Sequence, residues 1–309
     1  MLYALLTIAA LPAVSQDYPS KPIRVLTTDA GSQSDMISRM IGQAIAGPLG
    51  QPVIIDNRGL ISAEAAAKAT PDGYTLLING PFIWLTPFLR SNVSYDPIRD
   101  FAPITLAATG LNILVVHPSL PVDSVKGLIA FAKARPGQLN YGSAAVGGTP
   151  HLAAELFRSM TQVDIVRVPY KSLPQAATGL LSGEIHLMFP TAGSAVPHVT
   201  ARRLKALAIT SAQRSPLFPD LPTVAASGVP GYESTSIAGV FAPGKTPVAI
   251  INRLNQEIVR ALQRSELKDR FSAGGIEVVG SSPQEFEAAV KADMVRMGKV
   301  IKDVGIRVQ

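Results

Sequence analysis

A loop of small, uncharged residues is the stretch of this sequence best suited to chemistry. It follows a short apolar strand at residues 139–141 and leads into a helix, for which Thr149 is the expected N-cap and Pro150 the first residue. Glycine at three positions lets the backbone approach a bound group closely: Gly142, Gly147 and Gly148. Because free backbone N–H groups and the helix dipole both favour negative charge, the stretch predicts an anion site without Lys or Arg. An ordinary strand-to-helix turn would have the same composition and remains the alternative.

The same composition recurs in three other loops, each of which follows an expected strand. These loops cover residues 29–35, 79–82 and 190–193, and all are rich in Gly, Ser, Thr or Asn. Ligands of open α/β sheets bind beyond the carboxyl ends of the strands. Four small polar loops at equivalent positions therefore favour one shared site over four unrelated turns.

Acyl transfer is the alternative chemistry that the central stretch offers, through Ser143 and His151. Tyr141 and Ala145 occupy the positions at which a nucleophile elbow has glycine, so the G-x-S-x-G pattern is absent. The remaining histidines lie apart in the sequence, at His117, His186 and His198. A catalytic triad or a metal site needs more convergence than this. We therefore expect no catalytic residue, no cofactor and no metal ligand.

Composition limits the class of protein. The chain has 309 residues, of which 47% are hydrophobic and 16% charged, and this favours two globular domains. It contains no Cys, which excludes disulfides and thiolate chemistry. The net charge of +6 is spread along the chain, and its densest group is Arg202, Arg203 and Lys205. Without an aromatic or basic stripe beside it, this group indicates a solvated helix end and no nucleic-acid partner.

The first residues have the character of a secretory leader. Residues 2–11 are almost wholly apolar, and small residues follow up to Ser15. This predicts a signal peptide over residues 1–16 that is removed on export, because the apolar run is too short to span a bilayer. No Lys or Arg precedes the run, so we expect translation to begin a few codons upstream. A buried N-terminal strand or helix is the alternative.

Strand and helix signals alternate along the rest of the chain, which indicates an α/β fold. The first block has expected strands at residues 23–28, 52–55, 74–78 and 112–116. The second has them at residues 139–141, 164–169, 186–189 and 204–210. A strand at 236–241 and a helical tail follow, with a capping box at Ser282–Glu285 before the last helix. Two such blocks and a returning tail predict two lobes with a cleft.

Several segments together resemble the Bug-type extracytoplasmic solute receptors of tripartite tricarboxylate transporters. The matching segments are YPSKPIRVL, GQPVIIDNRG, AAKATPDGYTLL, DFAPIT, LVVHPSLP, LNYGSAAVGGTPHLAAELF, VPYKSLPQA and FPDLPTVAASGVPGYE. The resemblance implies a periplasmic-binding-protein-like fold of two α/β lobes, with a ligand cleft and two crossovers near residues 117–120 and 232–236. Lobe 1 would comprise residues 17–117 and 235–309, and lobe 2 residues 118–234.

The loops and the resemblance together indicate which residues contact the ligand. They are Gly31, Ser32, Gln33, Ser34, Asp35, Asn79, Gly80, Ser143, Ala144, Gly147, Gly148, Thr149, Tyr170, Lys171 and Thr191. In the first loop Ser32 replaces the second glycine that the family usually has. Lys171 is either a direct cation for a carboxylate or a solvated lysine at the cleft rim.

The expected function is capture of a small organic anion, a carboxylate, without chemical change. The resemblance implies a monomeric receptor in the periplasm that delivers its ligand to the membrane permease subunits of a tripartite transporter. A ligand-sensing receptor that serves a signalling protein is the first alternative, and a serine hydrolase is the second. No residue of the sequence identifies which carboxylate is bound.

Overall fold

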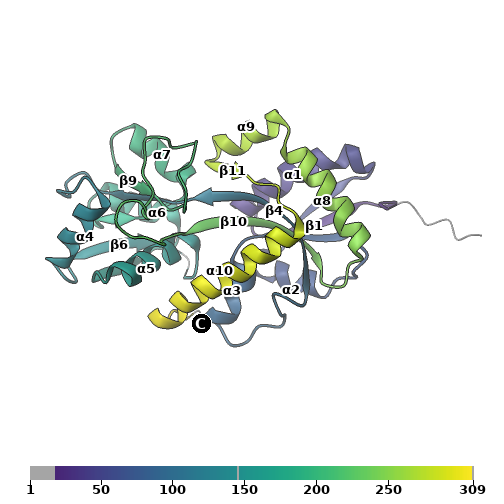
Figure 1. The fold of residues 1–309 in the computed structure, drawn as a ribbon, viewed down its shortest axis with the longest axis horizontal. Helices are drawn as coiled ribbons and strands as arrows, with labels where there is room; N and C mark the ends of the chain where they lie inside the picture. Colours follow the sequence, from purple (N-terminus) through teal and green to yellow (C-terminus); the bar gives the residue numbers. More distant parts are fainter. Residues whose placement is uncertain (1–17, 145, 308–309) are drawn as a thin grey trace, which may run out of the picture.

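The computed structural model describes residues 18–144 and 146–307, which fold into two α/β lobes side by side (Figure 1). The leader expected over residues 1–16 lies outside the described residues. Within the described ranges, no helix has both the length and the apolar character needed to cross a membrane.

The first lobe is built on a six-stranded sheet with the order β11-β4-β10-β3-β1-β2. β1 runs parallel to β2 and β3, whereas β10 runs antiparallel to β3 and β4. The strands are β1 (Ile23–Thr27), β2 (Val53–Asn57), β3 (Thr75–Asn79), β4 (Phe101–Leu111), β10 (Thr235–Pro243) and β11 (Ile276–Val278). The helices are α1 (Gln33–Leu49), η1 (Gly59–Ile61), α2 (Ser62–Ala67), α3 (Phe82–Leu89), α8 (Val248–Leu262), α9 (Ser265–Ala273) and α10 (Pro283–Val304).

The second lobe is built on a five-stranded sheet with the order β7-β6-β8-β5-β9. β6 runs parallel to β7 and β8, and β5 runs antiparallel to β8 and β9. The strands are β5 (Ile113–Val116), β6 (Leu139–Ser143), β7 (Ile165–Pro169), β8 (Leu187–Met188) and β9 (Lys205–Ile209). The helices are α4 (Val125–Lys133), α5 (Thr149–Thr161), α6 (Leu173–Leu181) and α7 (Ala192–Thr200).

The first passage between the sheets differs from the sequence-based expectation. The strand expected at residues 112–116 was placed in lobe 1, yet β5 bonds to β8 and β9 of the second sheet. The chain is extended from β4 through Asn112 into β5, so no Gly or Pro turn marks the passage. We therefore propose that lobe 1 ends at Asn112, and that the chain returns to it at residues 232–235.

A continuous apolar core joins the two lobes along α10. Trp84 of α3 is fully buried, and its indole N–H donates to Asp293 of α10 at 2.8 Å. The same cluster of buried side chains continues into lobe 2, where it includes Tyr141 and Phe157. α10 begins at the expected capping box and reaches across to α5 of lobe 2 (Figure 1). This helix therefore fixes one side of the junction between the lobes.

Candidate functional site

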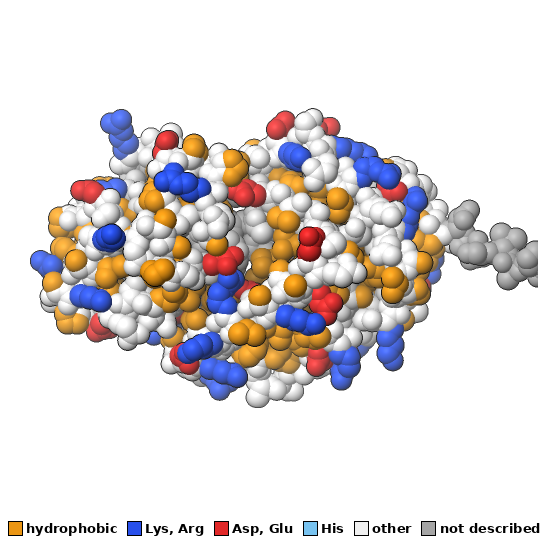
Figure 2. Space-filling model, viewed as in Figure 1, with side chains coloured by type: hydrophobic (Ala, Val, Ile, Leu, Met, Phe, Trp, Pro, Cys, Tyr) orange, Lys and Arg blue, Asp and Glu red, His pale blue; other side chains and the backbone are white. Residues whose placement is uncertain are grey.

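A cavity of about 580 Å³ lies between the lobes. Figure 2 shows the waist at which the two lobes meet. Lobe 1 contributes the start of α1, the end of β4, one residue of β10 and the turn between α9 and β11, whereas lobe 2 contributes the first residues of three helices. The wall consists of Gly31, Ser32, Gln33, Met36, Gly110, Leu111, Thr149, Pro150, Leu173, Thr191, Ala192, Gly193, Ser194, Ser236, Gly274, Gly275 and Ile276.

Four helices begin at this cavity, namely α1, α5, α6 and α7. Each helix start presents backbone N–H groups and the positive end of a helix dipole. None of the described residues of the wall is Lys, Arg, His, Asp or Glu. The arrangement can therefore hold an anion through backbone N–H groups, hydroxyls and an amide.

The caps of α5 and α7 leave their first N–H groups free of side-chain partners. Thr149 was expected to cap α5, but the N-cap is Gly148, and Thr149 is the first helical residue. Gly148 makes no side-chain cap because glycine has no side chain. Thr191 is the N-cap of α7, yet its hydroxyl lies 3.0 Å from the hydroxyl of Ser194 and does not cap the backbone. These two helix starts therefore remain open to a ligand.

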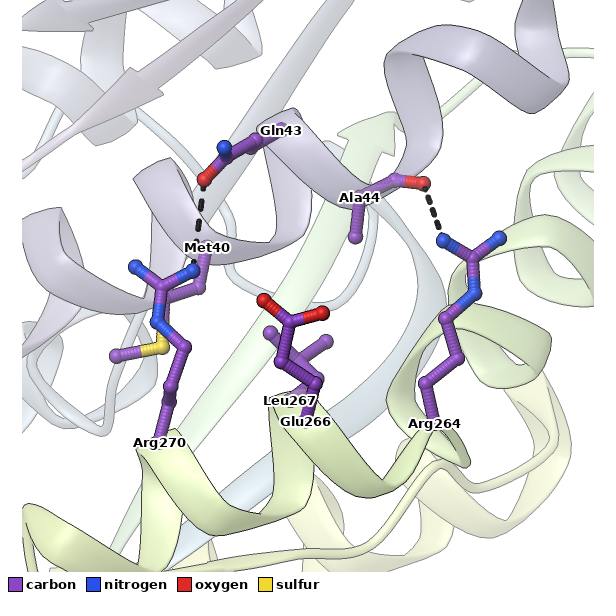
Figure 3. A pocket seen from close by; sticks show the side chains of 7 residues that line it. All are labelled: Met40, Gln43, Ala44, Arg264, Glu266, Leu267 and Arg270. Carbon is purple, nitrogen blue, oxygen red and sulfur yellow. Dashed lines mark hydrogen bonds between the residues drawn. The ribbon is translucent and has the colours of Figure 1, made fainter.

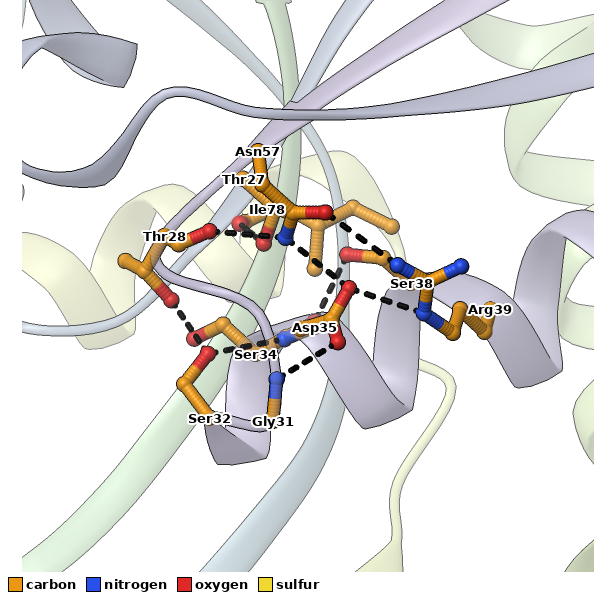
Figure 4. Close-up of polar contacts among 10 residues, drawn as sticks. All are labelled: Thr27, Thr28, Gly31, Ser32, Ser34, Asp35, Ser38, Arg39, Asn57 and Ile78. Carbon is orange, nitrogen blue, oxygen red and sulfur yellow. Dashed lines mark hydrogen bonds and ion pairs between the residues drawn. The ribbon is translucent and has the colours of Figure 1, made fainter.

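The start of α1 is organised around the carboxylate of Asp35 (Figure 4). That carboxylate is almost fully buried and accepts bonds from the Gly31 N–H and the Asn57 amide, both at 2.9 Å, and it pairs with Arg39 at 3.0 Å. Burial opposes its ionisation, but the bonds from Asn57, Gly31 and Arg39 outweigh burial and lower the pKa of Asp35. Ser32 caps the helix by accepting from the Asp35 N–H at 3.1 Å. Asp35 therefore fixes the conformation of the loop without lining the cavity.

Five of the predicted site residues line the cavity and ten do not. Those on the wall are Gly31, Ser32, Gln33, Thr149 and Thr191. Those outside the wall are Ser34, Asp35, Asn79, Gly80, Ser143, Ala144, Gly147, Gly148, Tyr170 and Lys171. Three of the four predicted loops meet at the cavity, the loop at residues 79–82 does not, and most of the loops' polar groups bond within the protein.

Asn79 and Gly80 support the loop that follows β3. The Asn79 side chain is buried, accepts from the Gly80 N–H at 2.8 Å and donates to the Ser62 hydroxyl at 3.2 Å. A Cβ on Gly80 would come within 2.8 Å of the Ile237 carbonyl oxygen, so only glycine fits there without a shift. This loop is consequently fixed to β10 and not to the cavity.

The loop after β6 is fixed by hydrogen bonds to Arg167 and His151, neither of which lines the cavity. Arg167 donates through Nε to the Ser143 hydroxyl and through Nη2 to the Ala144 carbonyl, both at 2.8 Å. The Gly147 N–H donates to Nδ1 of His151 at 3.0 Å. These bonds set the direction in which α5 starts, and so the position of Thr149 on the cavity wall.

A buried polar network surrounds His151. The Tyr141 hydroxyl donates to Glu155, which also pairs with Arg158 at 2.8 Å. Burial, followed by the charges of Arg167 and Arg158, lowers the pKa of His151 to about 4. His151 is therefore neutral near pH 7 and acts as an acceptor for the loop.

The alternative of a serine hydrolase finds no support in these bonds. The Ser143 hydroxyl is fully buried and accepts from Arg167, whereas Nδ1 of His151 accepts from a backbone N–H. A nucleophile must instead reach substrate and donate its proton to a base. The described ranges also contain no group of three or more His, Cys, Asp or Glu arranged to hold a metal ion.

The VPYK element lies outside the cavity. Lys171 is exposed, and its backbone N–H donates to Gln175 at 3.3 Å. The Tyr170 ring lies beside Gly142, and its hydroxyl is buried beside Gly179 and has no hydrogen-bond partner among the described residues. Of the two roles considered for Lys171, the solvated position is the one that the structure favours.

Sequence reasoning missed most of the apolar part of the wall. The residues that it did not single out include Met36, Gly110, Leu111, Leu173, Ser236, Gly274, Gly275 and Ile276. Gly274 and Gly275 form the turn between α9 and β11, and the adjacent glycines were a signal that could have indicated a close approach. The others belong to regular strands or helices and carry no such signal.

A smaller cavity of about 160 Å³ lies between α1 and α9 (Figure 3). Arg264 and Arg270 flank it, and they donate at 3.5 Å to the Ala44 carbonyl and the Gln43 side chain. Glu266 lies between the two arginines, so the charge is partly compensated. All of its wall belongs to lobe 1, and the cavity between the lobes is the better candidate for a ligand site.

Comparison with known proteins agrees with this geometry. The model of the family described as "Tripartite tricarboxylate transporter family receptor" matches residues 37–306. Protein BugT of Bordetella pertussis is 32% identical over 97% of this chain and 94% of its own length. A protein from the tcbD-tcbE intergenic region of Pseudomonas sp. (strain P51) is 34% identical over 92% of this chain and 86% of its own length.

Solved structures agree as well. Rpa4515 of R. palustris, solved with adipate, has a TM-score of 0.80 and 38% identity, covering 94% of this chain and 99% of its own. MatC of Rhodopseudomonas palustris, solved with malate, has a TM-score of 0.74 and 28% identity, covering 92% and 100%. The prediction of a periplasmic-binding-protein-like fold is thereby confirmed.

These relatives are solute-binding receptors, so the prediction that the chain is not an enzyme is confirmed as well. The matched residues cover most of the chain and include every helix whose start lines the cavity except the first residues of α1. The chain belongs to the tripartite tricarboxylate transporter receptor family.

Proposed function

We propose that this protein is a periplasmic receptor that binds a small carboxylate between its lobes and delivers it to the permease subunits of a tripartite transporter. The observation that carries the proposal is the convergence of four helix starts on a cavity whose described wall has no charged side chain. Such a site attracts an anion strongly enough to bind it and lacks a fixed cation that would hinder its release.

The relatives support this ligand class and compartment. Two solved structures similar to this chain contain adipate and malate, and a third is described as a periplasmic binding protein. A periplasmic receptor needs the leader predicted over residues 1–16, removed on export. We propose that it acts as a monomer, because a cavity between two lobes of one chain needs no second copy.

Calorimetric titration of the refolded protein tests the binding step. Refolding removes any ligand carried through purification, after which malate, adipate, hexanoate and citrate are compared with glucose and ATP. At least one carboxylate should bind, and neither control compound should. The proposal would be refuted if none of the four carboxylates bound.

A matched pair of variants tests the place of binding. Ser194→Asp adds a negative charge to the cavity wall near the start of α7, and it should weaken carboxylate binding about tenfold or more. Gln213→Glu adds the same charge at an exposed position outside the wall and should leave binding unchanged.

The delivery step needs a separate experiment. Proteoliposomes that contain the permease subunits should take up the bound carboxylate only when the receptor is added. A receptor that binds its ligand but does not support uptake would point instead to the sensing role considered from the sequence.

A further inference from the structure

The two sides of the cavity differ in their charge. On the lobe 2 side, α5 and α7 begin without a side-chain cap and without an acidic residue in the first turn. On the lobe 1 side, Ser32 caps α1, and the Asp35 carboxylate lies in its first turn. That carboxylate also takes the N–H of Gly31, which belongs to the cavity wall. The positive end of α1 is thus already compensated, whereas those of α5 and α7 are not.

The lobe 1 side of the wall is also largely apolar. Met36, Leu111 and Ile276 contribute to it, and Leu111 and Ile276 are buried. A Cβ on Gly274 would lie 3.4 Å from the methyl carbon of Met36 and 3.6 Å from Cδ1 of Ile276, so these side chains gather beside the α9–β11 turn. The polar side chains on the lobe 1 side of the wall are all uncharged: Ser32, which caps α1, Gln33 and Ser236. The Ser236 hydroxyl donates to the Gln33 amide oxygen at 3.4 Å.

This asymmetry decides what the second end of a ligand can be. An ionised carboxylate that leaves water needs a cation or several free N–H groups to compensate its lost hydration. The described residues on the lobe 1 side of the wall include no cation. The negatively charged carboxylate of Asp35 lies next to this side, bonded to the N–H of Gly31. Methylene or ring carbons, in contrast, gain free energy on leaving water for such a surface.

We propose that the cavity selects carboxylates with one charged end and an apolar body, so that monocarboxylates bind in preference to di- and tricarboxylates. The carboxylate lies at the starts of α5 and α7, and the apolar body lies against Met36, Leu111 and Ile276. This inference rests on the proposed function, since it assigns a ligand class to the same cavity.

Hexanoate and adipate form the decisive pair, because they have the same chain length and differ only in a terminal methyl or carboxylate group. Calorimetric titration of the refolded protein should give a dissociation constant for hexanoate at least about tenfold lower than that for adipate. Equal or tighter binding of adipate would overturn the inference and leave the proposed function intact. Absence of binding by both compounds, and by malate and citrate, would overturn both.

A charge-introducing variant locates the uncharged end. Met36→Lys places a cation on the lobe 1 side of the wall, and it should shift the ratio of adipate to hexanoate affinity about tenfold or more towards adipate. Met36→Leu keeps the side apolar and should leave the ratio unchanged. Should Met36→Lys fail to fold, Ser236→Lys offers the same readout from β10. An unchanged ratio in a folded lysine variant would overturn the assignment of the ligand's ends.

Discussion

Gly193 at the start of α7 lies against Gly274 of the other lobe, so close that a Cβ on Gly193 would come within 2.8 Å of the Gly274 carbonyl oxygen. A Cβ on Gly275 would likewise lie 2.9 Å from the Gly193 nitrogen. Nearby, the Ser215 hydroxyl donates to Glu277 of β11. In Figure 1 the region of α7, α9 and β11 lies away from α10, so the lobes are joined at two separate places.

Gly193→Ala should weaken ligand binding without unfolding the protein. The added methyl group would meet backbone, which cannot turn aside, and relief of the clash requires the lobes to separate. If binding needs the arrangement of the lobes described here, a steric penalty of about 1–3 kcal/mol in that arrangement corresponds to roughly a 5- to 150-fold loss of affinity. Calorimetric titration measures the affinity. Thermal melting without ligand should change little, because separation of the lobes relieves the clash and leaves the fold of each lobe intact.

Gly47→Ala is the control for this variant. Gly47 lies within α1, and a Cβ there would have no heavy atom within 4 Å. Affinity should be unchanged and stability equal or higher, because alanine favours helix more than glycine does. An unaltered affinity in Gly193→Ala would mean that the lobes do not need this contact to hold the ligand.

The sequence predicted the alternation of elements well where turns carry Gly or Pro, and poorly elsewhere. α3 is not predicted from the sequence, because Pro87 lies inside it and because its residues are almost all apolar, which hides the helical period. β4 was not predicted as a strand, and its passage into β5 was misplaced, because an extended chain that changes sheets has no local mark.

The candidate site shows a similar limit. The composition of the loops indicated where they converge, but composition does not tell whether a polar group bonds to a ligand or to the protein. Ser143 and Asp35 have the residue types of ligand contacts, yet their bonds go to Arg167 and to Asn57 and Gly31. Arg167 and Asn57 are more than 20 residues from the side chains to which they bond, and only the packed structure brings them together.

Asp35→Asn should destabilise the protein far more than Arg39→Ala. The buried carboxylate accepts from three donors, on Gly31, Asn57 and Arg39. An amide has only one acceptor oxygen, so its NH₂ group would face at least one of these donors, and the lost hydrogen bond costs about 1–3 kcal/mol. The Arg39 side chain is 56% exposed, so its ion pair contributes less than about 1 kcal/mol. Chemical denaturation near pH 7 measures both losses. Similar small losses in the two variants would show that the carboxylate is not the organising group of this loop.

Asn112→Leu should stabilise the protein. The side chain of Asn112 is fully buried between β4 and β5, and neither of its polar atoms has a hydrogen-bond partner among the described residues. An apolar side chain of similar size removes this unpaired amide and should raise the free energy of unfolding by about 1–2 kcal/mol. Asn79→Leu is the control and should lower it, because the Asn79 amide bonds to Ser62 and Gly80. Destabilisation by Asn112→Leu would show that its amide is bonded when the lobes are arranged differently.

His151 should make the stability fall as the pH drops from about 6.5 to about 4. Burial and the neighbouring arginines lower its pKa from 6.5 to about 4, so in this range the unfolded chain binds a proton that the folded protein does not. The stabilisation is therefore complete above pH 6.5 and is lost as the pH falls through 4, by at most about 3 kcal/mol. Chemical denaturation at a series of pH values measures the slope.

His151→Gln isolates this effect from the titration of the other groups. Glutamine provides a side-chain oxygen that can accept from the Gly147 N–H, which donates to His151 at 3.0 Å in the natural chain, but it does not titrate. The variant should therefore fold at pH 7 and lose less stability between pH 6.5 and 4. His186, whose pKa is also lowered by burial and by His117, is present in both proteins and cancels in the comparison. Identical slopes would mean that His151 is protonated as easily in the folded protein as in the unfolded chain, and that its bond to the loop does not depend on a neutral ring.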